Sequence, residues 1–203
     1  MESSDDEINE IREEIKSKRH DIERITTNIR SMQIKSFDDL SKYEKRNEEA
    51  LIKLARKTEA NKRRGHNIGI FGLTSTGKST MVNSLLGKKV ADTGVGETTK
   101  EITPYQGTGY TLWDAPGRND ELNYSNQKYI SFIKGLTRRL ILIQSTIKEN
   151  LRFMRLLDEL GLGYDIIVNK FDDIDEDERS EFERKIRREV DSSGLRNYKN
   201  FFF

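Results

Sequence analysis

The run from Gly72 to Ser79 is the feature that most constrains what this chain can fold into. It reads Gly-Leu-Thr-Ser-Thr-Gly-Lys-Ser and matches the G-x-x-x-x-G-K-S pattern of a phosphate-binding loop. Glycine at positions 72 and 77 permits backbone angles and a close approach that a side chain would block, so successive N–H groups can face one anion. In such a loop Lys78 reaches the outer phosphates and the Ser79 hydroxyl binds Mg2+. The run therefore predicts a nucleotide-binding loop that leads into a helix.

The segments around the loop have the pattern of alternating strands and helices. Residues 67–71 form a short apolar run, and residues 78–86 continue as a helix. Further strands are expected at residues 102–106, 110–113, 139–144, 164–168 and 201–203, and further helices at 124–135, 149–160 and 175–190. The first two of these strands are joined by a Gly-Thr-Gly turn, so they are expected to pair antiparallel. The sequence predicts an α/β fold with a doubly wound, mostly parallel sheet and one antiparallel edge strand, which binds ligands beyond the carboxyl ends of its strands.

Two more motifs follow directly after apolar strands. Residues 114–117 read D-x-P-G, where the Asp114 carboxylate can hold Mg2+ through a water and the Gly117 N–H can meet a γ-phosphate. Residues 169–172 read N-K-x-D, where the Asp172 carboxylate can accept hydrogen bonds from N1–H and the 2-amino group of guanine. Adenine lacks this pair of donors and would leave the carboxylate unpaired, which makes the motif selective. The motifs in this order predict a guanine-nucleotide site.

A threonine pair lies between the phosphate loop and D-x-P-G. Residues 94–101 read Gly-Val-Gly-Glu-Thr-Thr-Lys-Glu and include Thr98 and Thr99. One of these hydroxyls could cap Mg2+ and sense the γ-phosphate. The alternative, which the residues alone leave open, is that both are ordinary loop threonines.

With these motifs the chain resembles the P-loop GTPases of the translation-factor-related class, over roughly residues 67–203. Its Thr-Gly-Val, Thr-Thr-Lys-Glu and Trp-Asp-x-Pro-Gly segments and its helical N-terminal flank are most similar to the interferon-inducible, immunity-related GTPases. The resemblance implies the P-loop GTPase fold, with GTP or GDP and Mg2+ as cofactors. The family's spacing favours Thr99 over Thr98 as the threonine of the metal site.

The resemblance also assigns site residues by group. The nucleotide is expected to be held by Gly72, Thr74, Ser75, Thr76, Gly77, Lys78, Ser79 and Thr80 at the phosphates and by Asn169, Lys170 and Asp172 at the base. The metal is expected to lie near Ser79, Thr99 and Asp114. The residues expected to act in catalysis are Lys78, Thr99 and Gly117.

Two departures from the family pattern change what is expected. Arg118 follows D-x-P-G, where Ras-like enzymes carry the glutamine that orients the attacking water. Arginine stays protonated and cannot act as a base, although it could stabilise phosphate charge or lie on a surface loop. We therefore expect GTP hydrolysis to be slow without a partner or self-association.

The second departure is at the end of the chain. The Ser-Ala-Lys segment of the family does not follow residues 201–203, so the sequence predicts a GTPase domain, residues 65–203, that is truncated at its C-terminal end.

Residues 1–64 have a helical pattern and form the second predicted domain. An apolar heptad seam runs through Ile8, Ile11, Ile15, Ile22, Ile25, Ile29 and Met32. A second helix is expected to end at the basic run Lys62-Arg63-Arg64, as a solvated helix end before Gly65. Two alternatives remain open for this arm: a hairpin that packs on the nucleotide domain, or a coiled coil that forms a homodimer or oligomer.

The composition narrows the class of protein further. The formal net charge is +1, so no long-range field would attract nucleic acid or anionic lipid, and no nucleic-acid partner is expected. Cysteine is absent, which excludes disulfides and thiolate metal sites. His20 and His66 have no further ligand at metal-binding spacing and are expected to be structural or exposed. The chain has no apolar run of membrane-spanning length, which predicts a cytoplasmic protein and leaves peripheral membrane association open.

These features predict a GTP-binding regulatory protein that hydrolyses GTP with Mg2+ and changes conformation or self-association with nucleotide state. Its effector is expected to be a protein of unknown identity. The alternative is a nucleotide-dependent coiled-coil interaction module with negligible hydrolysis, which the arginine after D-x-P-G would explain.

Overall fold

The computed structural model describes residues 2–31, 45–91, 102–115 and 127–203. The chain divides into two compact units. One consists of Met1–Glu59 and Asn123–Ser131, and the other of Ala60–Leu122 and Phe132–Phe203.

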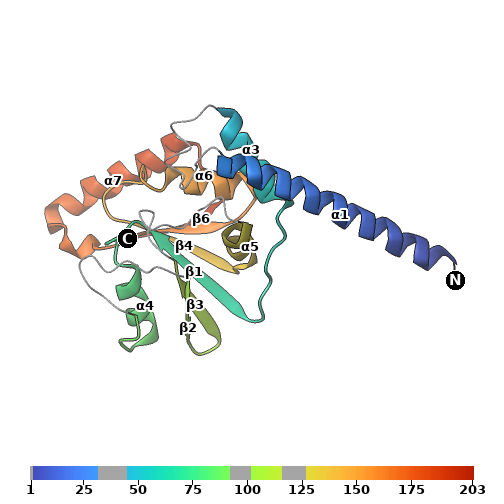
Figure 1. Ribbon diagram of the computed structural model, residues 1–203. Coiled ribbons are helices and arrows are strands. Elements are labelled where there is room, and N and C mark those ends of the chain that lie inside the picture. Colours follow the sequence, from blue (N-terminus) through green and yellow to red (C-terminus); the bar gives the residue numbers. More distant parts are fainter. Residues whose placement is uncertain (1, 32–44, 92–101, 116–126) are drawn as a thin grey trace. The chain divides into compact units, whose positions relative to one another are not determined.

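A six-stranded sheet forms the centre of the larger unit (Figure 1). Its strands are β1 (His66–Gly72), β2 (Thr103–Gln106), β3 (Tyr110–Asp114), β4 (Arg138–Ile143), β5 (Tyr164–Val168) and β6 (Tyr198–Phe202). They lie in the order β2-β3-β1-β4-β5-β6, and every neighbouring pair is parallel except β2 and β3. The predicted α/β fold, with one antiparallel edge strand, is therefore confirmed. The apolar runs at residues 140–143 of β4 and 166–168 of β5 are typical of strands covered on both faces.

Helices follow the strands in alternation. They are α4 (Lys78–Leu86), α5 (Gln127–Gly135), α6 (Leu151–Glu159) and α7 (Glu176–Ser193), with a short 3-10 turn η1 (Phe171–Asp173) after β5. Side chains alternate along β1, so Ile70 and Phe71 lie on opposite faces of the sheet. Ile70 belongs to a buried cluster with Val82 of α4 and Leu112 of β3. Phe71 contacts Phe153 of α6, with ring centroids 5.0 Å apart. Helices thus cover both faces, as in a doubly wound sheet.

A buried arginine closes the C-terminal end of α5. Arg139 on β4 is 5% exposed, and its guanidinium donates hydrogen bonds to the carbonyl oxygens of Ile133 (2.6 Å) and Leu136 (3.0 Å). The last carbonyls of a helix have no partner within the helix and carry partial negative charge. Burial lowers the pKa of Arg139 to about 10. Because this value is still well above neutral pH, the guanidinium remains charged there. The sequence analysis treated this arginine only as the start of a strand.

Replacing Arg139 with leucine is expected to lower the free energy of unfolding by about 2–3 kcal/mol, since buried carbonyl groups lose charged donors. Equilibrium unfolding in urea measures this change. Arg188→Leu is the matched control, because Arg188 is exposed on α7. Equal unfolding midpoints for the two variants would show that the guanidinium does not stabilise this helix end.

The smaller unit contains α1 (Glu2–Ser31) and α3 (Lys45–Lys57), which contact each other. An ion pair joins Asp21 of α1 to Lys57 of α3, and the lysine lowers the pKa of the carboxyl. Ile22 and Ile25 of the heptad seam are buried, whereas Ile15 is 45% exposed. The contacts between α1 and α3 are those of an intramolecular helical hairpin, while Ile15 leaves part of the seam exposed. No helix in the described ranges is both long enough and apolar enough to cross a membrane.

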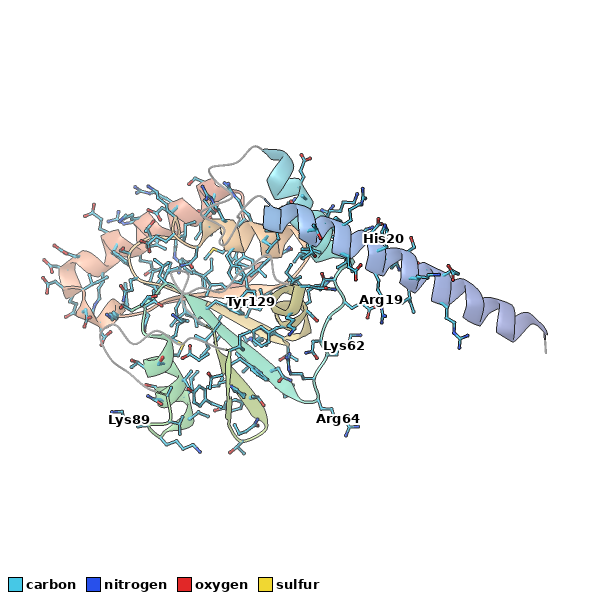
Figure 2. The ribbon with its side chains drawn as sticks, in the orientation of Figure 1. Arg19, His20, Lys62, Arg64, Lys89 and Tyr129 are labelled. Atoms are coloured by element: carbon cyan, nitrogen blue, oxygen red, sulfur yellow. The ribbon has the colours of Figure 1, made fainter. Side chains whose placement is uncertain are left out.

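The predicted end of the second helix is wrong. Helix α3 ends at Lys57, and residues 59–63 have no regular structure. Arg63 packs against aromatic rings, with its Cζ 4.6 Å from the Trp113 ring centroid and 5.1 Å from that of Phe132. Lys62 and Arg64 have exposed side chains (Figure 2). The basic run is thus not a helix end, because its central residue packs on rings that follow much later in the chain.

Candidate nucleotide-binding site

The predicted phosphate loop connects β1 to α4 and has a positive φ angle at three positions. The φ angle is +149° at Gly72, +67° at Ser75 and +90° at Gly77. A Cβ on Gly72 would lie 2.6 Å from the Leu142 carbonyl oxygen, and one on Gly77 would lie 2.3 Å from Asn169 Nδ2. Gly72 is therefore required by the backbone of the neighbouring strand β4, and Gly77 leaves room for the Asn169 side chain.

Lys78, at the start of α4, lies inside this loop. The residue is 7% exposed, and its Nζ donates hydrogen bonds to the carbonyl oxygens of Gly72 (3.2 Å) and Leu73 (2.9 Å). A buried ammonium needs oxygen acceptors, and here they come from the loop itself. Because an ammonium is a flexible point charge, it can turn from these carbonyls to phosphate oxygens.

The first two motifs meet at the carboxyl ends of β1 and β3. These strands are parallel, with Ile70 in register with Asp114, and the Ala115 N–H donates to the Ile70 carbonyl (3.2 Å). The Ser79 hydroxyl donates a 2.8 Å hydrogen bond to Asp114 Oδ2. The structure thus brings together two of the residues predicted to lie near Mg2+.

The chemistry of this pair fits a hard divalent cation, which prefers hydroxyl, carboxylate and water oxygens. Among the described residues, no group of three or more His, Asp or Glu side chains is arranged to hold a metal ion. Ser79 and Asp114 alone offer too few oxygens for Mg2+, which usually keeps several waters and binds substrate phosphates.

The N-K-x-D segment lies beyond β5. Asn169 Nδ2 donates to the Thr76 carbonyl at 2.7 Å, so the structure places this side chain against the phosphate loop. Lys170 has a φ of +60° and begins η1, which contains Asp172. The Asp172 side chain is exposed, and its carbonyl accepts a 3.2 Å hydrogen bond from Arg179 of α7. This bond anchors the turn while the carboxylate remains accessible to a base.

Gln144 belongs to none of the sequence motifs and was not predicted as a site residue. Its Nε2 donates a 3.0 Å hydrogen bond to the Ser75 carbonyl in the middle of the phosphate loop. Gln144 directly follows the buried strand β4, just as Asn169 follows β5. A polar residue immediately after a buried strand is the signal that could have revealed it.

The remaining predicted residues are distributed as follows. Thr74 and Thr76 lie on the loop, and Thr80 lies on the first turn of α4 with an exposed side chain. Thr98, Thr99, Gly117 and Arg118 fall outside the described residues.

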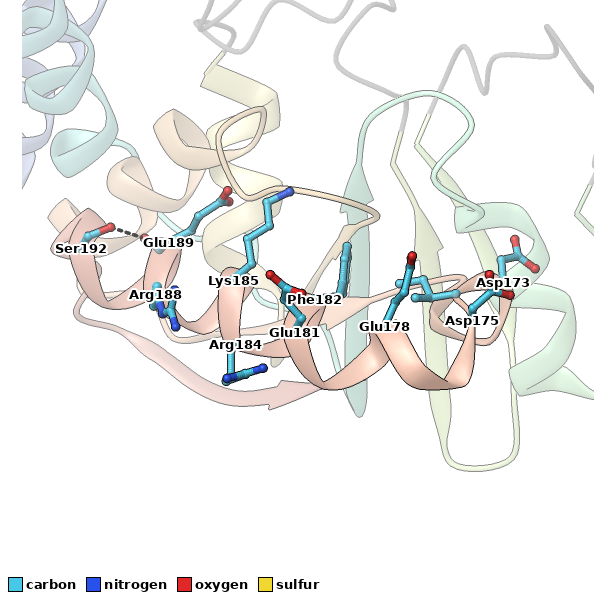
Figure 3. A pocket seen from close by; sticks show the side chains of 11 residues that line it. Asp173, Asp175, Glu178, Glu181, Phe182, Arg184, Lys185, Arg188, Glu189 and Ser192 are labelled. Carbon is cyan, nitrogen blue, oxygen red and sulfur yellow. Dashed lines mark hydrogen bonds between the residues drawn. The ribbon is translucent and has the colours of Figure 1, made fainter.

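A separate groove of about 970 Å³ runs along α7 (Figure 3). Glu178 and Glu181 line one half and Arg184 and Arg188 the other. None of the predicted nucleotide-binding residues lines this groove. It is therefore a different surface from the candidate nucleotide site.

A glycine-rich loop between β1 and α4, at the carboxyl edge of a doubly wound sheet, defines the class of P-loop nucleotide-binding proteins. Comparison with known families is more specific. Residues 67–170 match the family described as "50S ribosome-binding GTPase", and the chain belongs to this GTPase family. The matched range extends from the start of β1 to the N-K-x-D segment.

Individual relatives cover the same region. T-cell-specific guanine nucleotide triphosphate-binding protein 2 of Mus musculus is 32% identical over 146 residues, which are 66% of this chain and 34% of that protein. GTPase Der of Staphylococcus aureus (strain JH9) is 28% identical over 139 residues, which are 60% of this chain and 32% of that protein. The chain thus spans about a third of the length of these curated relatives. The predicted resemblance to P-loop GTPases, and among them to the immunity-related GTPases represented by the mouse protein, is confirmed.

Among solved structures, the apo form of translation elongation factor SelB from Methanococcus maripaludis is similar with a TM-score of 0.47 and 16% sequence identity. The similarity covers 70% of this chain and 30% of that one.

Proposed function

We propose that this chain binds GTP together with Mg2+, hydrolyses the γ-phosphate, and changes conformation or self-association with its nucleotide state. The observation that carries this proposal is the meeting of Ser79 and Asp114 at 2.8 Å, next to the loop that holds Lys78. Membership of the GTPase family supports guanine as the base.

The chain's own groups would act mainly by positioning and by charge. Phosphoryl transfer needs little covalent chemistry from the protein, so stabilising the phosphate charge supplies most of the catalysis. Lys78 and the loop N–H groups would bind the phosphate oxygens. Ser79 and, through water, Asp114 would hold Mg2+, which neutralises developing charge when bound. The roles of Thr99 and Gly117 at the γ-phosphate rest on the family resemblance.

Guanine recognition would depend on Asp172. Replacing Asp172 with asparagine is expected to lower GTP affinity by roughly 10- to 100-fold, because a charged acceptor is lost. The same change is expected to raise the affinity for xanthosine triphosphate, since the amide can donate to the carbonyl that replaces the 2-amino group. Calorimetric titration with both nucleotides measures the change in preference.

Asp173→Asn is the matched control, because Asp173 is a second exposed carboxylate in the same turn. It is expected to leave the preference for guanine intact. A base preference that stays the same in the Asp172 variant would rule out the N-K-x-D assignment.

A second function is favoured by Arg118, which stands where related enzymes orient the attacking water. In that case the chain is a nucleotide-dependent interaction module with negligible hydrolysis, and the helices α1 and α3 contact the partner. Phosphate release measured against protein concentration separates the two functions. A rate per molecule that rises with concentration supports self-activated hydrolysis, whereas no release at any concentration supports the interaction module.

A further inference from the structure

Two side-chain amides from neighbouring strands hold the phosphate loop from the same direction. Gln144 follows β4 and donates to the Ser75 carbonyl at 3.0 Å, and Asn169 follows β5 and donates to the Thr76 carbonyl at 2.7 Å. The strands are parallel with Ile143 in register with Val168, so the two amides are the next residues on each strand. The loop therefore has two consecutive carbonyl oxygens fixed by the sheet edge below it.

These bonds also determine where the loop's N–H groups point. In a planar trans peptide unit the carbonyl of one residue and the N–H of the next point in opposite directions. Holding the Ser75 carbonyl toward Gln144 therefore directs the Thr76 N–H across the loop, where it donates a 3.3 Å hydrogen bond to the Leu73 carbonyl oxygen and closes the turn. Holding the Thr76 carbonyl similarly directs the Gly77 N–H away from Asn169. An N–H that points into such a loop can contribute to an anion-binding concavity.

The backbone at Ser75 needs this support. Its φ of +67° is in the left-handed region, which costs a residue with a Cβ about 1–2 kcal/mol. The Ser75 side chain is exposed, so packing around it does little to hold the conformation. A hydrogen bond to its carbonyl is a direct way to keep the peptide unit in place.

We propose that Gln144 is a positioning residue of the nucleotide site, which works with Asn169 to hold the turn of the phosphate loop in the conformation that directs the Gly77 N–H toward the bound phosphates. This inference rests on the proposed function. It assigns Gln144 no contact with the nucleotide itself, and it predicts an effect on phosphate binding without an effect on base preference.

The test compares Gln144→Met, which keeps the length of the side chain and removes its donor, with the unchanged chain. Loss of one hydrogen bond is expected to weaken GTP and GDP binding equally, by about fivefold. The preference for guanine over xanthine is expected to stay the same, and the melting temperature of the nucleotide-free protein is expected to fall by only about 2–4 °C, the effect of one lost hydrogen bond. Gln144→Glu keeps the shape but places an acceptor against the Ser75 carbonyl, so its loss is expected to be larger, about tenfold or more.

Gln106→Met is the matched control. Gln106 is an exposed glutamine at the end of β2, in register with Thr111 near the amino end of β3, far from the phosphate loop. Nucleotide affinity of this variant is expected to equal that of the unchanged chain.

The outcomes separate this inference from the function on which it rests. If the unchanged chain binds neither GTP nor GDP, the proposed function fails and the role of Gln144 fails with it. If it binds both and Gln144→Met binds them as tightly, only the positioning role is overturned. A fall of about 10 °C or more in the melting temperature of the nucleotide-free Gln144→Met protein would also overturn it, because the residue would then stabilise the fold in general.

Discussion

Replacing Lys78 with alanine is expected to lower GTP affinity by roughly 100- to 1000-fold, because phosphate oxygens lose a buried charged partner worth about 3–4 kcal/mol. Calorimetric titration with GTP and Mg2+ measures the loss. The ammonium is buried and already bonded to two loop carbonyls, so phosphate binding needs only a short movement of Nζ. The nucleotide-free protein is expected to stay folded, because alanine at this position removes the cost of burying a charge.

Lys89→Ala is the control for the lysine experiment. Lys89 follows α4 with its side chain in solvent (Figure 2) and is expected to have no effect on affinity. GTP affinity that is undiminished in the Lys78 variant would refute the role of the loop, and with it the candidate site.

Replacing Gly77 with alanine is expected to weaken GTP and GDP binding by about 100-fold. The new Cβ would lie 2.3 Å from Asn169 Nδ2, so either the loop or the asparagine must move. The φ of +90° adds backbone strain for a residue with a side chain, for a total on the order of 3 kcal/mol. Either movement breaks the bond between Asn169 and the Thr76 carbonyl and turns the loop N–H groups away from the phosphates.

Gly87→Ala separates backbone strain from steric contact. Gly87 caps the other end of α4 with a φ of +64°, and a Cβ there would meet nothing within 4 Å. This variant is expected to be less stable by about 1 kcal/mol and to bind nucleotide normally. If Gly77→Ala also binds normally, the contact between the loop and Asn169 is not needed for phosphate binding.

Local patterns in the sequence were enough to predict the alternation of strands and helices. The last strand was predicted at residues 201–203, whereas β6 spans Tyr198–Phe202. Apolar runs such as residues 164–168 have the length and content of buried strands, and β5 occupies that range. Helix ends were predicted less well where neighbours far along the chain decide them. Helix α3 ends at Lys57, and Arg63 leaves the expected helix to pack on Trp113 and Phe132. No local pattern shows that those rings lie beside residue 63.

The same distinction applies to the site. The motifs predicted Lys78, Ser79 and Asp114, and the structure brings the last two within hydrogen-bond distance. The motifs gave Asn169 a role at the base, whereas the structure places its side chain on the Thr76 carbonyl. Gln144 belongs to no motif, and its bond to Ser75 exists only because β1 and β4 are neighbours.

The sequence by itself determined which groups are available to this protein: a glycine-rich loop of the phosphate-binding pattern and the two carboxylates that we propose for a metal and for guanine. These groups belong to motifs whose residues lie within a few positions of one another, and such short spacings along the chain set the local geometry directly. Only the tertiary structure decided which partners support that chemistry. Arg139 bonds the end of the helix that comes just before its own strand, whereas the two amides behind the phosphate loop come from strand ends distant in sequence. The packing of helix and strands brings these groups together.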